Sequence, residues 1–150
     1  MTEFKFRGKT EVGKLLVCGD LLQNEEGTFI VSTFKIECCD NETADLFATA
    51  WDKVIPSTIG QYTGAQDNNK NDLYVGDIFE TWYKSALDGK EKISRYEIIF
   101  QNYCFMAKCL TKSYEESFPL FMVLRNDYNV ELIGNVYNNQ ELLETQQNDR

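Results

Sequence analysis

The chain has 150 residues, 43% of them hydrophobic and 13% aromatic, and its formal net charge is −9. This length and composition predict a compact folded protein rather than a disordered one. The sequence has no run of about 18 apolar residues and begins with charged residues in place of an apolar signal segment, so we expect a cytoplasmic protein without a membrane partner. The acidic balance argues against a nucleic-acid partner, because binding to a phosphate backbone requires Lys and Arg.

The basic stretch of the chain lies near the N-terminus. We interpret it as the solvated face of a strand, since a short charge run is most often exposed to water. Direct binding of a nucleic acid would depend on this stretch. Its members are Lys5, Arg7, Lys9 and Lys14.

Five cysteines are present, and histidine is absent. An odd number of cysteines without an export signal is not typical of a disulfide framework. Adjacent Cys38 and Cys39 would point to opposite faces of a strand, as would Cys104 and Cys109, and this arrangement disfavours a shared metal site. We therefore expect no metal, and we interpret the cysteines, Cys18 included, as small buried hydrophobic residues.

Short β-rich runs separated by turn residues dominate the sequence, which predicts a mainly β fold. Residues 14–22 and 27–38 are two such runs, and the loop between them, which ends at Gly27, is of the hairpin type. Residues 95–110 form a long aromatic and β-branched run. This run predicts either a strand pair or one bent strand.

Residues 43–54 allow two interpretations. Their apolar side chains recur at helical spacing behind a possible cap, which favours a helix. The helical set comprises Thr43 as the cap and Leu46, Phe47, Ala50, Trp51 and Val54. The same segment can also be a strand, because alternate residues would then share one face. The strand set comprises Phe47, Thr49, Trp51 and Lys53.

The last third of the chain contains two further predicted elements. Residues 117–125 and 129–137 flank an Asn- and Asp-rich segment suited to the tip of a hairpin. Residues 138–144 predict a short C-terminal helix, with Asn138 as its cap and Glu141 three residues later.

A Gly-Asp pair followed by an aliphatic residue occurs twice, within residues 17–22 and 74–79. Each copy precedes a Gly-containing loop and a second β-rich run. The pair indicates either two similar small β units or a turn that is common before strands.

The segment of residues 59–79 is predicted to connect two β units. Gly60 and Gly64 would let the chain turn on both sides of Tyr62, and Gly76 with Asp77 would form a bend. We expect Val at Gly64 or Gly76 to destabilise the fold, because a Cβ is disfavoured at positive φ.

Between these glycines, residues 67–72 form a polar turn in which Asn68 or Asn69 could adopt positive φ. The turn leads into Leu73 and Tyr74, whose side chains are expected to reach the core.

Three blocks of sequence, residues 5–9, 54–78 and 131–144, resemble the YopX-like family of phage and prophage proteins. The middle block is the most specific. Its matching residues are Gln61, Tyr62, Thr63, Gly64, Asp67, Asn69, Tyr74, Gly76 and Asp77, and the last block adds Gly134 and Asn135. Lys70 departs from the pattern, because the family usually has Gly there, so a loop looser than a type I′ turn is expected.

The resemblance implies one compact unit with two parts. These are an N-terminal β subdomain at about residues 1–60 and an SH3-like barrel at about residues 61–150, packed together and followed by the short helix. It favours the strand interpretation for residues 43–54 and a structural role for the motif residues. It also implies homo-oligomers and a bacterial host, while the family's biochemical role is not established.

The sequence does not favour catalysis. Without histidine there is no Ser-His or Cys-His pair, and neither a phosphate-binding loop nor a dinucleotide fingerprint is present. We expect no catalytic residue and no cofactor, and we expect a module that binds a host or phage protein or assembles with itself. The alternative is a barrel that binds a nucleic acid or mimics one.

Overall fold

The computed structural model describes residues 3–38, 44–111, 116–124 and 129–144. Strands predominate in these ranges, so the prediction of a mainly β fold is confirmed. The chain divides into two compact units, Met1–Tyr62 and Thr63–Arg150. Among the described residues, no helix is long and apolar enough to cross a membrane.

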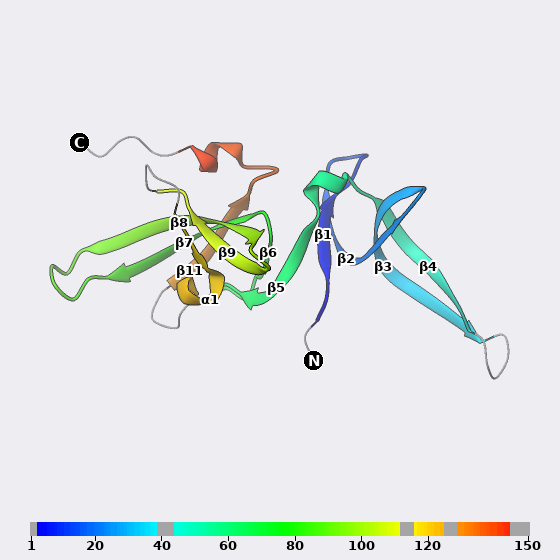
Figure 1. Cartoon of the computed structure of the whole chain (residues 1–150), viewed down its shortest axis with the longest axis horizontal. Helices are drawn as coiled ribbons and strands as arrows, with labels where there is room; N and C mark the ends of the chain where they lie inside the picture. The colour runs from blue at the N-terminus through cyan, green and yellow to red at the C-terminus, as the bar shows by residue number, and fades with distance from the viewer. Residues whose placement is uncertain (1–2, 39–43, 112–115, 125–128, 145–150) are drawn as a thin grey trace. The chain divides into compact units, whose positions relative to one another are not determined.

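The first unit is an antiparallel arrangement of long strands (Figure 1). Strand β2 pairs with β1 on one side and with β3 on the other, while β4 pairs with β3, and the start of β5 pairs with β1. A short 3₁₀ helix, η1, links β4 to β5. The elements are β1 (Phe6–Lys9), β2 (Leu16–Asn24), β3 (Gly27–Cys38), β4 (Ala44–Lys53), η1 (Pro56–Thr58) and β5 (Gly60–Gln66).

Strands β2 and β3 form the predicted hairpin, in which Asn24 pairs with Gly27 around a two-residue loop. Gly27 has a φ of 143°, which a residue with a Cβ rarely adopts. Residues 44–53 form a strand that pairs with β3 along its length, so the helix interpretation is wrong. Cross-strand pairing outweighs the helical spacing of the apolar residues, and Thr43, the expected cap, lies outside the described residues.

The core of the first unit is small. Ile30, Val31 and Val54 are almost completely buried there. Arg7 is buried as well, and the Nζ atom of Lys5 lies 4.5 Å from the centre of the Tyr62 ring. The N-terminal basic stretch is therefore not simply a solvated strand face, because β1 is an inner strand of its sheet.

The second unit contains a five-stranded antiparallel sheet in the order β10-β9-β8-β7-β11. The SH3-like barrel expected here remains a prediction, since the pairing establishes a sheet and not its closure. The elements are β6 (Asp72–Tyr74), β7 (Asp77–Lys84), β8 (Glu91–Gln101), β9 (Cys104–Cys109), β10 (Ser117–Pro119), α1 (Leu120–Val123), β11 (Asn129–Asn135) and η2 (Gln140–Leu143).

Residues 95–110 belong to a strand pair, β8 and β9, rather than to one bent strand. The two residues between the strands, Asn102 and Tyr103, have φ values of 53° and 63°. Positive φ at both central positions is typical of the type I′ turn, whose twist matches that of the flanking strands.

The hairpin expected between residues 117–125 and 129–137 is wrong. Strand β10 pairs with β9 and β11 pairs with β7, so the two strands lie at opposite edges of the sheet. The helical turn α1 follows β10 directly, and its residues Leu120 and Val123 pack into the core with Phe79 and Ile98.

The cysteines only partly follow the expectation of burial. Cys109 is buried, while Cys104 and Cys18 are exposed. Cys104 and Cys109 thus differ in environment, as strand alternation predicted. The Cys38 side chain and the whole of Cys39 lie outside the described residues.

Positive φ in the connecting segment occurs at Gly64 (81°) and Gly76 (90°), as predicted, and not at Gly60, which pairs with Arg7 inside the sheet. In the polar turn it is Lys70 that has positive φ, at 68°, so the assignment to Asn68 or Asn69 is wrong. The Lys70 N–H donates to the Asp67 carbonyl oxygen at 3.1 Å, which makes a three-residue loop ending in a left-handed residue.

The two Gly-Asp pairs have different environments. Gly19 lies within β2, opposite Phe6, whereas Gly76 lies in the turn before β7. At the C-terminus, η2 is capped by Asn139 rather than Asn138, and the cap makes no side-chain hydrogen bond to the helix backbone. The Asn138 N–H instead donates to the Asn135 carbonyl, which belongs to the preceding turn.

We expect Lys70→Gly to stabilise the protein by about 1 kcal/mol, because the left-handed conformation costs a residue with a Cβ roughly that much. Lys70 is exposed, so little packing is lost. The measurement is the urea midpoint. Asn69→Gly is the matched control, because Asn69 does not have positive φ. A lower or unchanged midpoint for Lys70→Gly would show that the loop does not strain this residue.

We expect Gly76→Ala to cost more than Gly64→Ala, with Gly64→Ala near 1 kcal/mol. Both glycines have positive φ, but a Cβ at Gly76 would also lie 2.9 Å from the Tyr137 ring, whereas a Cβ at Gly64 meets open space. Chemical denaturation of the two variants measures the difference. Equal losses of stability in the two variants would mean that the Tyr137 ring moves away from the added Cβ at no cost in free energy.

Candidate functional site

The motif residue Asp67 is the centre of a hydrogen-bond network in the second unit. Its carboxylate accepts bonds from the backbone N–H groups of Asn69 (2.9 Å), Asn71 (2.8 Å) and Leu132 (3.0 Å), and from the Asn71 side-chain amide (3.0 Å). Burial alone would raise the pKa of Asp67, but these bonds favour the charged form and hold the pKa below its ordinary value. The network fastens the polar turn to β11.

The motif residues around Asp67 also bond mainly to backbone. The Thr63 hydroxyl donates to the Leu73 carbonyl at 2.8 Å, and the Asn69 contact with Asp67 uses its backbone N–H. Gln61 pairs with Phe6 in the first unit.

The bend before β7 is closed by a second carboxylate. Asp77 is buried, and its Oδ2 atom accepts the Tyr74 N–H at 2.7 Å. The Gly76 N–H donates to the Ile98 carbonyl at 2.8 Å, and the Gly76 carbonyl accepts the Val136 N–H at 2.9 Å. The bend thus joins β8 to the end of β11.

The last two motif residues shape the end of β11. Gly134 lies at a β-bulge in the pairing with β7, where a Cβ would come within 2.6 Å of Asn139. The Asn135 side-chain oxygen accepts the N–H groups of Tyr137 (3.1 Å) and Asn138 (3.0 Å), which makes a turn before η2.

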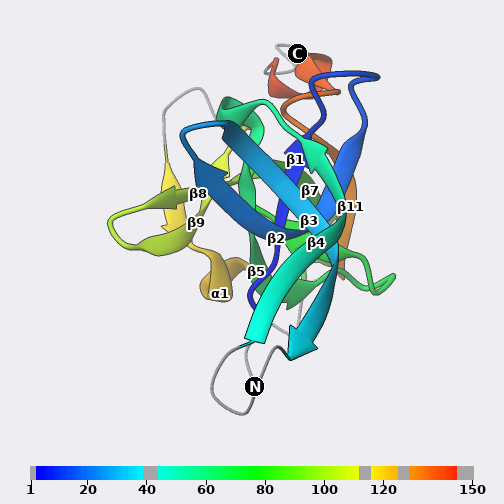
Figure 2. The same ribbon diagram turned by 90° about the vertical axis from the view of Figure 1, so that its right-hand side faces the viewer.

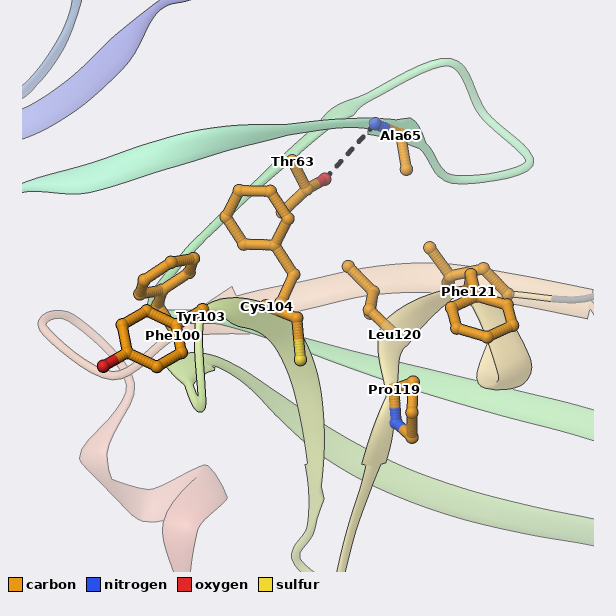
Figure 3. Close-up of a pocket in the computed structure, with 10 residues that line it drawn as sticks. Thr63, Ala65, Phe100, Tyr103, Cys104, Pro119, Leu120 and Phe121 are labelled. Carbon is orange, nitrogen blue, oxygen red and sulfur yellow. Dashed lines mark hydrogen bonds between the residues drawn. The ribbon is translucent and has the colours of Figure 1, made fainter.

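An apolar pocket of about 480 Å³ is present in the second unit (Figure 3). Thr63 is the motif residue that lines it, and no lining side chain is charged. In the close-up, Phe100 and Tyr103 lie at one end and Phe121 at the other, with Cys104 and Leu120 between them. The lining residues are Thr63, Ala65, Phe100, Tyr103, Cys104, Phe105, Pro119, Leu120, Phe121 and Leu124.

Strands β3 and β4 form a two-stranded ribbon with an exposed apolar face, which we call the ribbon face. The strands lie side by side in both views (Figures 1 and 2). In the register, Phe34 is opposite Ala48 and Ile36 is opposite Leu46, and opposite residues share a face. The residues of the ribbon face that are not buried are Leu22, Phe29, Phe34, Ile36, Leu46, Ala48, Trp51 and Lys53. Val31 lies in the same row, but it is almost completely buried.

Two β-bulges determine which residues join the ribbon face. The pairing skips one residue on each strand, between Val31 and Thr33 and again before Phe34. As a result Trp51 lies opposite Val31 on the ribbon face, while Phe47 lies opposite Lys35 on the other side. The predicted strand set is therefore wrong in placing Phe47 with Trp51, because it assumed an unbroken alternation. Trp51 and Lys53 do share a face, since they lie opposite Val31 and Phe29.

The sequence indicated only one of the two strands that form the ribbon face. In the sequence, Phe34 and Ile36 alternate with Lys35, which is the pattern of a strand with one apolar face. Leu46 and Trp51 belonged to the segment with two interpretations, and the pairing of β4 with β3 decided it. A pair of bulges has no clear sequence signal, so the face could not be assembled from periodicity.

Within the described part of the chain, no three His, Cys, Asp or Glu side chains are grouped so that they could hold a metal ion. Glu97 has a raised pKa, because burial disfavours its charged form, although Lys108 opposite it acts in the other direction.

We expect Asp67→Asn to destabilise the protein by about 3 kcal/mol, because an amide cannot accept all four bonds and leaves buried donors unpaired. A carboxylate with a lowered pKa contributes its stability above the unfolded value and loses it as the pH falls through the folded value. The difference between wild type and variant should therefore shrink in acid. Urea unfolding at several pH values measures it, with Asp20→Asn, at an exposed position of β2, as the control. If the difference in unfolding free energy between wild type and Asp67→Asn did not change with pH, the charge of Asp67 would not be what stabilises the turn.

Comparison with known proteins agrees with this architecture. The sequence profile of the family described as YopX protein matches residues 5–144. The crystal structure of protein EF1440 from Enterococcus faecalis is similar in fold, with a TM-score of 0.62 and 22% sequence identity over 96% of this chain and 100% of that one. No curated protein matches the chain. The match over nearly the whole length shows that the chain belongs to the YopX family.

Proposed function

We propose that this protein is a non-catalytic module that binds another protein through the ribbon face. The observation that carries this proposal is the exposure of large apolar side chains on β3 and β4. Ile36, Leu46 and Trp51 keep 66%, 61% and 56% of their surface exposed. Soluble proteins rarely leave such side chains contiguous, and where they do, the patch commonly contacts a partner.

The composition of the face fits protein recognition. Trp51 packs edge-on against Phe29, with ring centres 5.3 Å apart, and it is therefore held in place before a partner arrives. Large aromatic side chains at the centre of an interface contribute most of the binding energy. Ile36, Leu46 and Trp51 lie outside the small core of the first unit, which is formed by Ile30, Val31 and Val54.

The motif carboxylates support a non-catalytic role. The carboxylate of Asp67 accepts four hydrogen bonds, and that of Asp77 is buried and accepts a backbone N–H. A general acid or base must reach the proton that it transfers. The apolar pocket has no charged lining residue, and its polar side-chain groups are the hydroxyls of Thr63 and Tyr103 and the thiol of Cys104. We infer that the protein uses no cofactor. We also infer that its partner is a host or phage protein in the bacterial cytoplasm.

The test is a pull-down of the tagged protein from its bacterial host with and without nuclease, read by mass spectrometry. We expect a partner that survives nuclease, is lost with the double variant Ile36→Ser/Leu46→Ser, and is kept with Leu87→Ser/Ile93→Ser. The two control residues are exposed apolar residues of the second unit. Both double variants replace aliphatic residues with the same polar one.

A partner that is lost with nuclease would shift the function to nucleic-acid binding. A partner that survives both double variants would show that the ribbon face is not the binding surface. Light scattering on the purified protein gives the oligomeric state, and a fall in mass with the ribbon variant alone would identify a second copy of the chain as the occupant of this face.

A further inference from the structure

We propose that the outer edge of β4 binds an extended segment of the partner by strand addition, and that this segment alternates apolar and basic side chains. The inference rests on the proposed function and names the chemistry of the partner. It follows from the position of β4 in its sheet, from the faces on which its side chains lie, and from the charge around it.

Strand β4 (Ala44–Lys53) lies at the end of its sheet in the order β4-β3-β2-β1-β5-β6. One side of its backbone pairs with β3. On the other side the Lys53 carbonyl accepts the Glu11 N–H at 3.0 Å, and no described strand pairs with residues 45–52. Residues 45–53 are all exposed. An edge strand with unpaired backbone N–H and C=O groups is a template for another extended chain.

The two faces of β4 differ in chemistry. Leu46, Ala48 and Trp51 lie on the ribbon face, with Lys53 at its end, whereas Asp45 and Asp52 lie on the opposite face with Phe47. A strand added beside β4 places alternate side chains on these two faces. Its apolar side chains would extend the ribbon face, and the residues between them would lie beside the two carboxylates.

The negative charge of this region favours Lys and Arg in the partner segment, at the positions between its apolar residues. Residues 15–54 contain eight acidic and two basic side chains, which gives most of the net charge of −9. Opposite charges on neighbouring strands stabilise their pairing, and like charges directly opposite each other destabilise it. Lys and Arg therefore suit the face that carries Asp45 and Asp52.

The same charges disfavour a second copy of this chain at the edge. In an antiparallel pairing of two β4 strands, the register that brings Leu46 opposite Trp51 also brings Asp45 opposite Asp52. This repulsion occurs twice by symmetry, and each copy also brings its own acidic strands. A basic partner segment meets neither penalty.

The test uses a labelled peptide of about eight residues, alternating Lys and Val, which matches the open stretch of β4. Fluorescence anisotropy near 0.15 M salt measures its binding to the full chain. A peptide of the same composition with Val and Lys in two blocks controls for simple charge attraction, and an alternating Glu and Val peptide controls for the sign of the charge. We expect only the alternating basic peptide to bind well.

The protein variants locate the contact. We expect Asp45→Lys/Asp52→Lys to weaken binding of the alternating peptide at least about tenfold, since it places like charges beside the added strand. Glu91→Lys/Glu144→Lys changes the net charge equally, uses exposed residues of the second unit and should leave the affinity within about twofold. Hydrogen exchange should show new protection of β4 backbone amides when the peptide binds, which simple charge attraction would not produce.

Equal binding of the block peptide, equal weakening by the two charge variants, or unchanged exchange in β4 would each overturn strand addition. These outcomes are separate from those of the pull-down. If a partner depends on the ribbon face but the alternating peptide does not bind, the protein-binding function stands and strand addition by a basic segment is wrong. A ribbon-dependent fall in mass in light scattering would replace the basic partner with a second copy.

Discussion

The hydrogen bonds of the Asp67 carboxylate hold together the polar turn and a distant strand of the second unit. The carboxylate accepts four hydrogen bonds, three from a tight polar turn and one from Leu132, which is far away in the sequence. A buried charge is stable only where such donors surround it. The turn between β5 and β6 and the strand β11 therefore have to form together, and the bend at Gly76 joins the other end of β11 to β8.

The first unit is built under a different constraint. Strand β2 pairs with β3 only as far as Val31. From there to Cys38, β3 pairs with β4 alone, so the two strands form a ribbon with no third strand beside it among the described residues. Their apolar side chains remain on the surface, while the sheet near β1 buries Ile30, Val31 and Val54. The unit thus separates a small core, which maintains the fold, from a long exposed apolar face, which is the proposed binding surface.

The residues of the family motif do not lie on the proposed binding surface, because they serve the fold of turns and bends instead. The side chains of Thr63, Asp77 and Asn135 bond to backbone groups at turns and bends. Glycine and short polar side chains are common there, because they allow the backbone angles of a turn or bond to its backbone groups. The ribbon face comes from a segment that the motif does not include. The apolar pocket of the second unit lies near Thr63 but has no charged side chain to select a ligand.

The sequence by itself determined the β class, the β2–β3 hairpin and the positive φ at Gly64 and Gly76, because these depend on local alternation and on the steric freedom of glycine. It could not decide between helix and strand for residues 44–53, or foresee that residues 117–124 end in a helical turn at a sheet edge, since both depend on which distant strand is available for pairing. It also placed Phe47 and Trp51 on one face. Only the tertiary structure separated them, because two bulges in the pairing of β3 with β4 shift the alternation that a single strand would follow.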